Sequence, residues 1–416
     1  MTSARNLSFR QSLVAALLAV VSCCASQAVA QTYGIDFRNT LMPASGGMAG
    51  TSVAAPQDMI SAVNGNAAAL TQFQETRVTI GGAFAEATFD ISQNQPLPSL
   101  GVQPYAAKST TPGAVVPAIG AVMEIPNLPR RTVIGLGVFG SAGSGVGFEQ
   151  VPESNGTSSY LLLLEFAPSV AVEVTDKLSV GGTMFIGDGY LSGPFVGTSP
   201  MTNAYSLKAG LGLNYELGDA THLGAFWQST QAFRFQNATI LFNQDRAATV
   251  NIGLPQTVGL GISNQALLDG RLLLAADALY LNWKSAALLQ NIYQDQWAMQ
   301  LGMQYQASAR TKLRLGYALA GNPIDHSVGR SLGGVPVPGG VPAVKYLQAQ
   351  YAVVNPHRLT GGVGIEDVLP GLDLDAFAGG MFPANEVLSG ATSTNLASYW
   401  IGLGLTWHFD RSRRQG

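Results

Sequence analysis

The chain has little charge and almost no cysteine. Asp, Glu, Lys and Arg make up only 11% of its 416 residues, and the formal net charge is −3 at pH 7. No basic stripe interleaved with aromatic residues occurs, which argues against nucleic acid as a partner. The two cysteines, Cys23 and Cys24, both lie close to the N-terminus. If that segment is removed, the remaining chain has no disulfide and no Cys-based metal site.

Long apolar runs are also missing beyond the N-terminus. No run there approaches the roughly 20 residues that a transmembrane helix needs. Low charge together with 49 glycines is nevertheless unusual for a soluble protein of this length. A closed β-barrel resolves the conflict, because its strands satisfy one another's backbone and only every second residue must be apolar.

Alternation of apolar with small or polar residues is the main signal that is present. In 399–409, the residues Tyr399, Ile401 and Leu403 begin an apolar row, while Trp400 and Gly402 begin the opposite row. The same pattern predicts fourteen strands: 77–91, 115–125, 131–140, 162–175, 178–187, 206–217, 221–236, 247–263, 271–284, 296–307, 312–321, 357–366, 372–381 and 398–409. We therefore predict an all-β fold, a transmembrane antiparallel barrel of about fourteen strands. A soluble all-β protein is the alternative, but it would leave the apolar rows uncovered.

The gaps between these strands alternate short and long. Outer-membrane barrels typically have short turns facing the periplasm and long loops facing outward. The rhythm predicts a bacterial outer-membrane protein with both termini in the periplasm. Barrel residues would be 75–409, and the basic residues 410–416 would form a periplasmic tail.

The first thirty residues have the features of a cleaved signal peptide. Arg5 and Arg10 are basic, 13–21 is apolar, and Ala28-Val29-Ala30 is a small-x-small cleavage site. We assign 1–30 to this signal. The alternative is a lipoprotein signal at 20–23, which would leave Cys23 lipidated.

Residues 31–74 break the strand rhythm. The segment is rich in Gly, Ala and Ser and has no apolar row that could face lipid. Irregular backbone at membrane depth is tolerated inside protein, so a plug, or hatch, within the barrel is expected. A flexible periplasmic extension is the alternative, although Ala, Val, Met, Ile and Leu are more frequent here than is usual in a disordered tail.

The predicted inward rows carry few charges. Small residues dominate, with scattered Lys208, Lys312 and Arg314 that could meet a ligand carboxylate or pair with Glu216 and Asp277. Phe226 and the phenylalanines at 139, 185 and 377 suit either a hydrophobic ligand or packing against the plug. We expect no catalytic residue, no metal and no cofactor, because the four histidines show no ligand spacing.

Three stretches resemble the FadL/TodX type of outer-membrane fatty acid and hydrocarbon transporters. Residues 45–54 with Asp58 and 66–70 are similar to the family's hatch, 274–283 to its strand with an Asp and a following Trp, and 313–317 and 359–365 to later strands. The chain has Asn66-Ala67-Ala68 where the family's hatch usually has Asn-Pro-Ala.

The resemblance implies passive transport of hydrophobic compounds through a plugged barrel, with no enzyme activity. It also implies lateral exit near a distorted strand, for which Pro117 and 143–145 are candidates. Expected partners are hydrophobic small molecules and outer-membrane lipids, and the barrel is expected to be a monomer. The alternatives are a nonspecific aqueous porin, or a structural or adhesive surface barrel.

Overall fold

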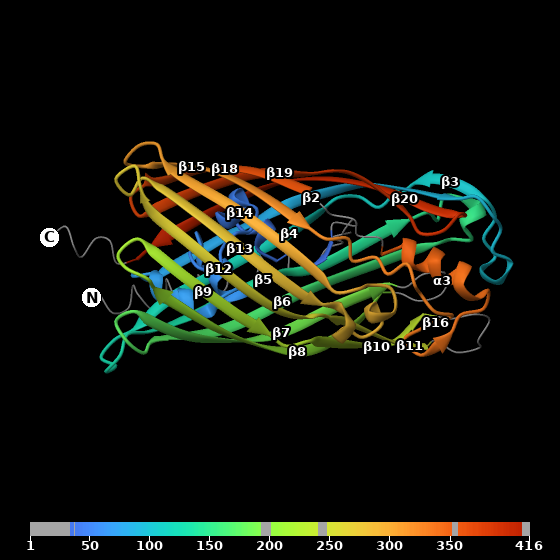
Figure 1. Ribbon diagram of the computed structural model, residues 1–416, viewed down its shortest axis with the longest axis horizontal. Coiled ribbons are helices and arrows are strands. Elements are labelled where there is room, and N and C mark those ends of the chain that lie inside the picture. Colours follow the sequence, from blue (N-terminus) through green and yellow to red (C-terminus); the bar gives the residue numbers. More distant parts are fainter. Residues whose placement is uncertain (1–33, 37, 193–200, 240–247, 352–356, 410–416) are drawn as a thin grey trace, which may run out of the picture.

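The computed structural model describes residues 34–36, 38–192, 201–239, 248–351 and 357–409. Its main feature is a closed antiparallel barrel (Figure 1). Neighbouring strands follow the order β2-β20-β19-β18-β15-β14-β13-β12-β9-β8-β7-β6-β5-β4, and β4 pairs with β2 to close the ring. Within the described residues the wall therefore has fourteen strands, which confirms the fold class predicted from the alternation.

The wall strands are β2 (Arg77–Gln93), β4 (Ala114–Ile125), β5 (Thr132–Gly147), β6 (Ser158–Glu173), β7 (Leu178–Ser192), β8 (Thr202–Glu216), β9 (Thr221–Gln228), β12 (Gln256–Leu267), β13 (Leu272–Asn282), β14 (Gln296–Gln306), β15 (Thr311–Ala320), β18 (His357–Leu369), β19 (Leu372–Val387) and β20 (Thr392–His408). The strands outside this ring are β1 (Gly34–Asp36), β3 (Tyr105–Lys108), β10 (Gln231–Thr239), β11 (Ala248–Leu254), β16 (Ser331–Leu332) and β17 (Val335–Pro336).

Two of the predicted strands are each divided in the structure. The segment 221–236 divides at Ser229 and Thr230, and 247–263 divides at Pro255. Between these breaks the chain leaves the wall as the separate hairpin β10–β11. Proline cannot donate to a ladder, so Pro255 was a signal for this break. A loop was also expected at 382–397, but β19 and β20 continue as a long hairpin across most of it.

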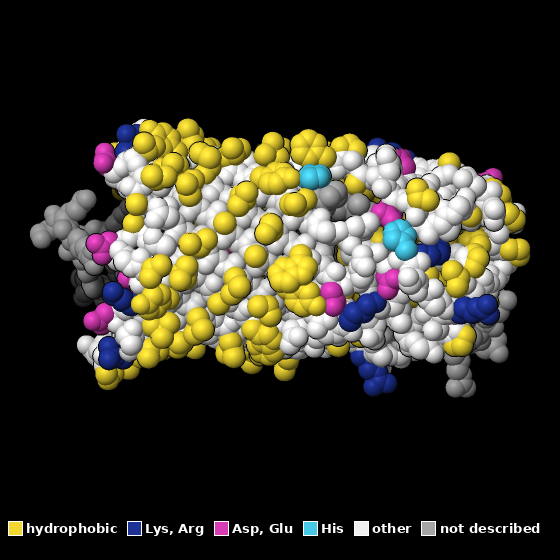
Figure 2. All heavy atoms as spheres, in the orientation of Figure 1, with side chains coloured by type: hydrophobic (Ala, Val, Ile, Leu, Met, Phe, Trp, Pro, Cys, Tyr) yellow, Lys and Arg dark blue, Asp and Glu magenta, His cyan; other side chains and the backbone are white. Residues whose placement is uncertain are grey.

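The two faces of the wall differ as the alternation requires. Leu207 and Leu211 on β8 are more than 60% exposed, whereas Lys208 and Gly210 between them are buried. Figure 2 shows apolar side chains over the middle of the barrel, with charged side chains at the rim beside the short turns and around the long loops. An apolar band between two polar rims fits a wall that crosses a membrane.

The plug lies inside the barrel. Its elements are η1 (Arg38–Leu41), η2 (Ser45–Met48), α2 (Met59–Asn64) and η3 (Ala67–Gln72). Glycines on the inner rows make room for it. A Cβ at Gly316 would lie 2.2 Å from the carbonyl carbon of Met48, and one at Gly212 would lie 2.1 Å from Oδ1 of Asn66. Plug and wall are therefore in backbone contact, and the luminal plug of the predicted fold is confirmed.

The end of the barrel with the long loops carries the remaining elements. These are η4 (Pro98–Leu100), η5 (Pro152–Ser154), η6 (Trp283–Ser285), η7 (Leu289–Asn291) and α3 (Gly340–Ala349). In Figure 1 this long-loop end lies at the right, with α3 and the β10–β11 hairpin. No helix among the described residues is both long and apolar enough to cross a membrane.

Candidate functional site in the lumen

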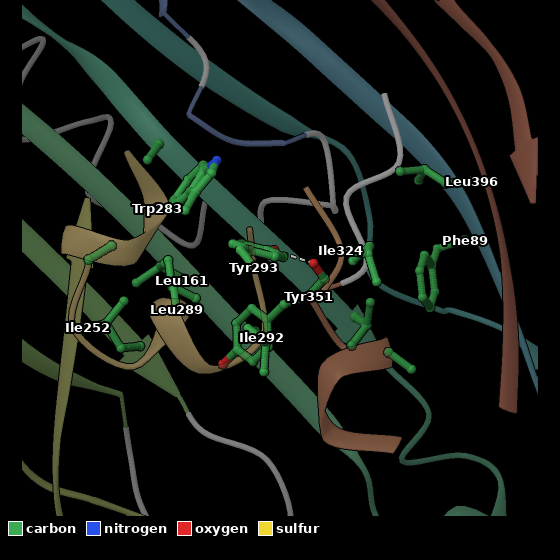
Figure 3. Packing of buried hydrophobic residues seen from close by; sticks show 14 of the residues in the cluster. Phe89, Leu161, Ile252, Trp283, Leu289, Ile292, Tyr293, Ile324, Tyr351 and Leu396 are labelled. Atoms are coloured by element: carbon green, nitrogen blue, oxygen red, sulfur yellow. Dashed lines mark hydrogen bonds between the residues drawn. The ribbon is translucent and has the colours of Figure 1, made fainter. Parts of the chain in front are cut away.

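The lumen beyond the plug is filled by one large apolar cluster, here called the upper lumen cluster. Figure 3 shows part of it, where wall residues meet side chains of the inserted loops. The wall contributes Phe89, Leu161 and Leu396, among others. The inserted elements contribute the larger share of aromatic and aliphatic side chains: Phe233, Phe235, Ile252, Trp283, Leu289, Ile292, Tyr293, Ile324, Tyr346 and Tyr351. Such a lining suits a hydrophobic solute.

Tyrosine hydroxyl groups hold the loops around this cluster. The hydroxyl of Tyr293 donates to the carbonyl oxygen of Tyr351, as the dashed line in Figure 3 marks. Tyr346 on α3 shares hydrogen bonds with Tyr105 on β3, at 2.6 Å, and with Thr157, at 3.0 Å. Burial raises the pKa of Tyr346 above its ordinary value, so its hydroxyl stays protonated at neutral pH.

Three polar side chains fix the plug. Asp58 caps α2, since its Oδ1 accepts from the Ser61 amide at 2.8 Å, and its Oδ2 also accepts from the amides of residues 44 and 45. Asn66 donates to the carbonyl oxygens of Val53 and Leu213, both at 2.8 Å. Asp277 on β13 accepts from the amides of residues 52 and 53. The last two side chains join plug and wall.

Asn66, Ala67 and Ala68, the hatch motif predicted from the sequence, touch the wall. Asn66 is the N-cap of η3, and its Oδ1 accepts from the amide of Ala68 at 3.2 Å. A Cβ at Gly181 on β7 would lie 2.4 Å from that same amide nitrogen. The motif is therefore seated on β7 and β8.

The predicted ligand-binding residues do not form one site. Lys208 is 6% exposed, and its Nζ lies 4.3 Å from the ring centre of Phe185. Phe226 is buried and faces the plug, with the Arg38 guanidinium 5.8 Å from its ring centre.

Lys312 and Arg314 lie elsewhere, beside a polar cavity of about 180 Å³ next to the plug. Arg314 donates to Gln304 at 2.7 Å and pairs with Asp375 at 2.6 Å. Lys312 pairs with Glu366 at 2.7 Å. Both cations thus have carboxylate partners, Glu366 on the adjacent strand β18 and Asp375 on β19, one strand further along the wall. Pairing with acids was one of the two interpretations of the sequence, but the acids expected there, Glu216 and Asp277, are not these partners.

Phenylalanines on the inner rows pack against the plug. Phe139 and Phe185 belong to a second apolar cluster, here called the plug cluster, with Ile60, Val63 and other plug residues. The ring of Phe377 lies against Gly46, where a Cβ would come within 2.5 Å of it. These rings occupy the lumen together with the plug, so their role in packing is visible in the fold.

The wall is interrupted between β4 and β5. These strands pair only as far as Ala118 and Phe139, and the register of β5 against β6 shifts between Gly140 and Ala142. Beyond the shift, β1 pairs with Ala142 and Gly143 instead of β4. The interruption adjoins both candidates, Pro117 and 143–145, that the sequence offered for a distorted strand.

Glu165, which was not among the residues predicted from the sequence, lies on the inner row of β6 beside this interruption. Its carboxyl group accepts from Ser141 at 3.3 Å and from Gln231 at 3.2 Å. The alternation of β6 puts Glu165 in phase with Leu163 and Ala167, which was a usable signal for an inward acid.

The histidines do not gather at one site. His408 contacts Glu75 at 3.0 Å and Asp373 at 2.8 Å, whereas His326 contacts Glu386 at 3.0 Å. Among the described residues, no group of three or more His, Cys, Asp and Glu is arranged to hold a metal ion.

Comparison with known proteins gives a family and several related folds. Residues 21–332 match the family described as outer membrane protein transport protein (OMPP1/FadL/TodX). The toluene transporter TodX of Pseudomonas putida is 16% identical with a TM-score of 0.63, and the match covers 91% of this chain and 99% of that chain. A FadL homologue of Pseudomonas aeruginosa is 15% identical with a TM-score of 0.62, and the match covers 92% of this chain and 100% of that chain.

A third structure, described as the CymD monoaromatic hydrocarbon channel, is 15% identical with a TM-score of 0.58, covering 91% of this chain and 99% of that chain. No curated protein matches the sequence. At these identities the structural comparisons establish the fold.

Proposed function

Because the chain belongs to the OMPP1/FadL/TodX family of outer-membrane transport proteins, we propose that it passively admits hydrocarbons or long-chain fatty acids through its plugged barrel. The observation that carries this proposal is the upper lumen cluster, an apolar interior that lies above a packed plug. Two of the structural relatives are described as a toluene transporter and a monoaromatic hydrocarbon channel, which supports an apolar solute.

An aqueous porin is not favoured. A porin keeps a polar, water-filled interior. Here the plug is in contact with inner-row glycines around the wall, and the space above it is lined by aromatic and aliphatic residues. The family consists of transport proteins, and we propose that this chain has no enzymatic activity.

For the route, we propose that a solute enters among the long loops and leaves sideways through the interruption between β4 and β5. The plug supports this route because Asn66 and Asp277 fix it to the wall and obstruct the direct path. Outward-facing apolar rows would then receive the solute in the membrane. In this scheme the short turns face the periplasm, and so do both termini of a monomeric barrel that begins at Gln31.

A reversible lock across the interruption tests the route. The Cβ of Val116 lies 3.7 Å from a Cβ built on Gly140, a separation that suits a disulfide. We expect the variant Val116→Cys/Gly140→Cys to take up labelled toluene or oleate slowly when oxidised, and at the normal rate after reduction. Each single cysteine variant is the matched control. Equal uptake in both redox states would rule out exit at this position.

Location is tested separately. Fractionation should place the protein in the outer membrane, as a band whose migration changes on heating. Mass spectrometry should find Gln31 at its start, although residues 1–33 lie outside the described residues. Labelling with palmitate would instead support Cys23 as the first residue, and a soluble periplasmic protein would contradict the proposed function.

A further inference from the structure

A polar layer, formed by Glu165, Ser141 and Gln231, lies beside β6 between the upper lumen cluster and the plug cluster. On the inner row of β6, Leu163 belongs to the former and Ala167 to the latter, and Glu165 stands between them. Glu165 is 1% exposed, and it is bonded to Ser141 of β5 and Gln231 of β10. The layer thus joins three segments at the depth where the wall is interrupted.

Gln231 presents an acceptor that nothing in the described part of the chain uses. The residue is fully buried, and its Nε2 donates to Glu165 at 3.2 Å. This bond fixes the orientation of the amide, and it leaves Oε1 buried without a donor among the described residues. The hydroxyl of Ser144, two positions along β5 from the shifted register, is likewise buried without a partner there. Buried polar atoms in native proteins normally have partners, so both atoms point to a ligand or water that supplies one.

The charges of the layer disfavour an anionic ligand. The amide of Gln231 lies over Gly187, where a Cβ would come within 2.4 Å of Nε2. Glu165 on β6 lies opposite Gly187, and Lys208 on β8 lies opposite Phe185, two positions along β7 on the same face. A carboxylate arriving here meets one buried acid and one base, so it gains no net opposite charge, and like charges repel at short range.

We propose that this layer is a subsite for uncharged, largely apolar compounds that carry one hydroxyl group, such as alkylphenols and alkanols. We also propose that it discriminates against carboxylates. The ligand hydroxyl donates to Oε1 of Gln231, and the hydrocarbon part lies among the side chains of the upper lumen cluster as the inserted loops give way. This inference rests on the proposed function and names its preferred substrate class.

Three solutes with one ring skeleton test the subsite: toluene, p-cresol and p-toluate. Their binding to the detergent-solubilised full-length protein is measured by calorimetry at pH 7.5. Gln231→Met keeps the side-chain length and removes the acceptor. A net hydrogen bond contributes a factor of roughly 2 to 12 in affinity. This variant should therefore lower the affinity for p-cresol by about that factor and leave the affinity for toluene within about twofold. Glu165→Gln removes the acid and should raise the affinity for p-toluate more than the affinity for the two uncharged solutes.

Gln93→Met is the matched control, because the amide oxygen of Gln93 already accepts from Thr392. It should not change the ratio of p-cresol to toluene affinity. An unchanged ratio in Gln231→Met would overturn the subsite. The subsite would also be overturned if p-toluate bound more tightly than toluene and p-cresol, and if Lys208→Met weakened the binding of p-toluate. If a folded, heat-modifiable barrel binds none of the solutes, the proposed function itself fails.

Discussion

The carboxylate of Asp277, on wall strand β13, accepts a hydrogen bond from the backbone amide of Ser52 in the plug at 2.7 Å. The same oxygen accepts from the amide of Val53 at 3.0 Å. Asp277 is 4% exposed, so this contact between wall and plug is shielded from water.

Removal of this acceptor should loosen the plug. Asp277→Ala leaves two buried amides without a partner, which costs about 1–3 kcal/mol for each unsatisfied group. We expect more frequent openings in planar-bilayer recordings and a lower urea midpoint. Asp219→Asn, at an exposed turn position, is the control and should change neither. Identical recordings for Asp277→Ala would show that the plug does not depend on this contact.

Ala67→Pro should be tolerated, and it would restore the Asn-Pro-Ala sequence of the family's hatch. Position 67 is the first residue of η3, where proline fits, and Asn66 before it is extended (φ −112°, ψ 95°). We expect a gain of about 0.4–1 kcal/mol from reduced freedom of the unfolded chain. Urea unfolding in detergent measures it. A loss of stability would mean that Gly212 and Gly181 leave no room for the ring.

Deletion of residues 31–74 should turn a nearly closed barrel into an open one. Glycines on the inner rows, such as Gly316 and Gly212, are left facing an empty lumen, so the pore becomes wide at its centre. We expect large, steady ion conductance in planar bilayers. The intact protein should conduct little, and high conductance before the deletion would favour the aqueous porin.

The ion pair of Arg314 and Asp375 should matter for stability more than for ligand binding. Arg314 is buried, so Arg314→Met leaves Asp375 as an uncompensated acid and should cost about 3–5 kcal/mol. The double variant Arg314→Met/Asp375→Leu should recover most of this loss. Urea titration of both proteins measures the difference. A selective loss of fatty acid binding at unchanged stability would instead assign Arg314 to the ligand.

Acid should loosen the loop that carries α3. The hydrogen bond from Lys284, at 2.8 Å, lowers the pKa of Asp325 below its ordinary value. The contribution of the pair is therefore complete above pH about 4 and is lost as the pH falls through the lowered pKa. The pair is partly exposed, so we expect an effect of about 0.2–1 kcal/mol. Cleavage of the loop by pepsin should accelerate at low pH, and less so in Lys284→Met, which lacks the pair at every pH.

The strand pattern alone was sufficient for most of the wall. Side chains alternate along a strand whatever surrounds it, so the rows of β8 and β20 could be assigned to lipid and lumen from the sequence. The absence of an apolar row in 31–74 likewise predicted a plug. The pattern failed at Ser229 and Thr230, because a hairpin turned into the lumen alternates with the same period as a wall strand.

The contacts inside the lumen were decided only by the tertiary structure. Alternation places Lys208, Arg314 and Asp375 on inner rows, but it does not say which of them meet. That depends on the register of neighbouring strands, and on a plug that lies more than 200 residues away in sequence from Asp277. The sequence by itself determined a barrel with an apolar outside and a filled inside. Its polar contacts arise from the pairing of distant segments, since the energy of a buried charge depends on neighbours that local periodicity does not encode.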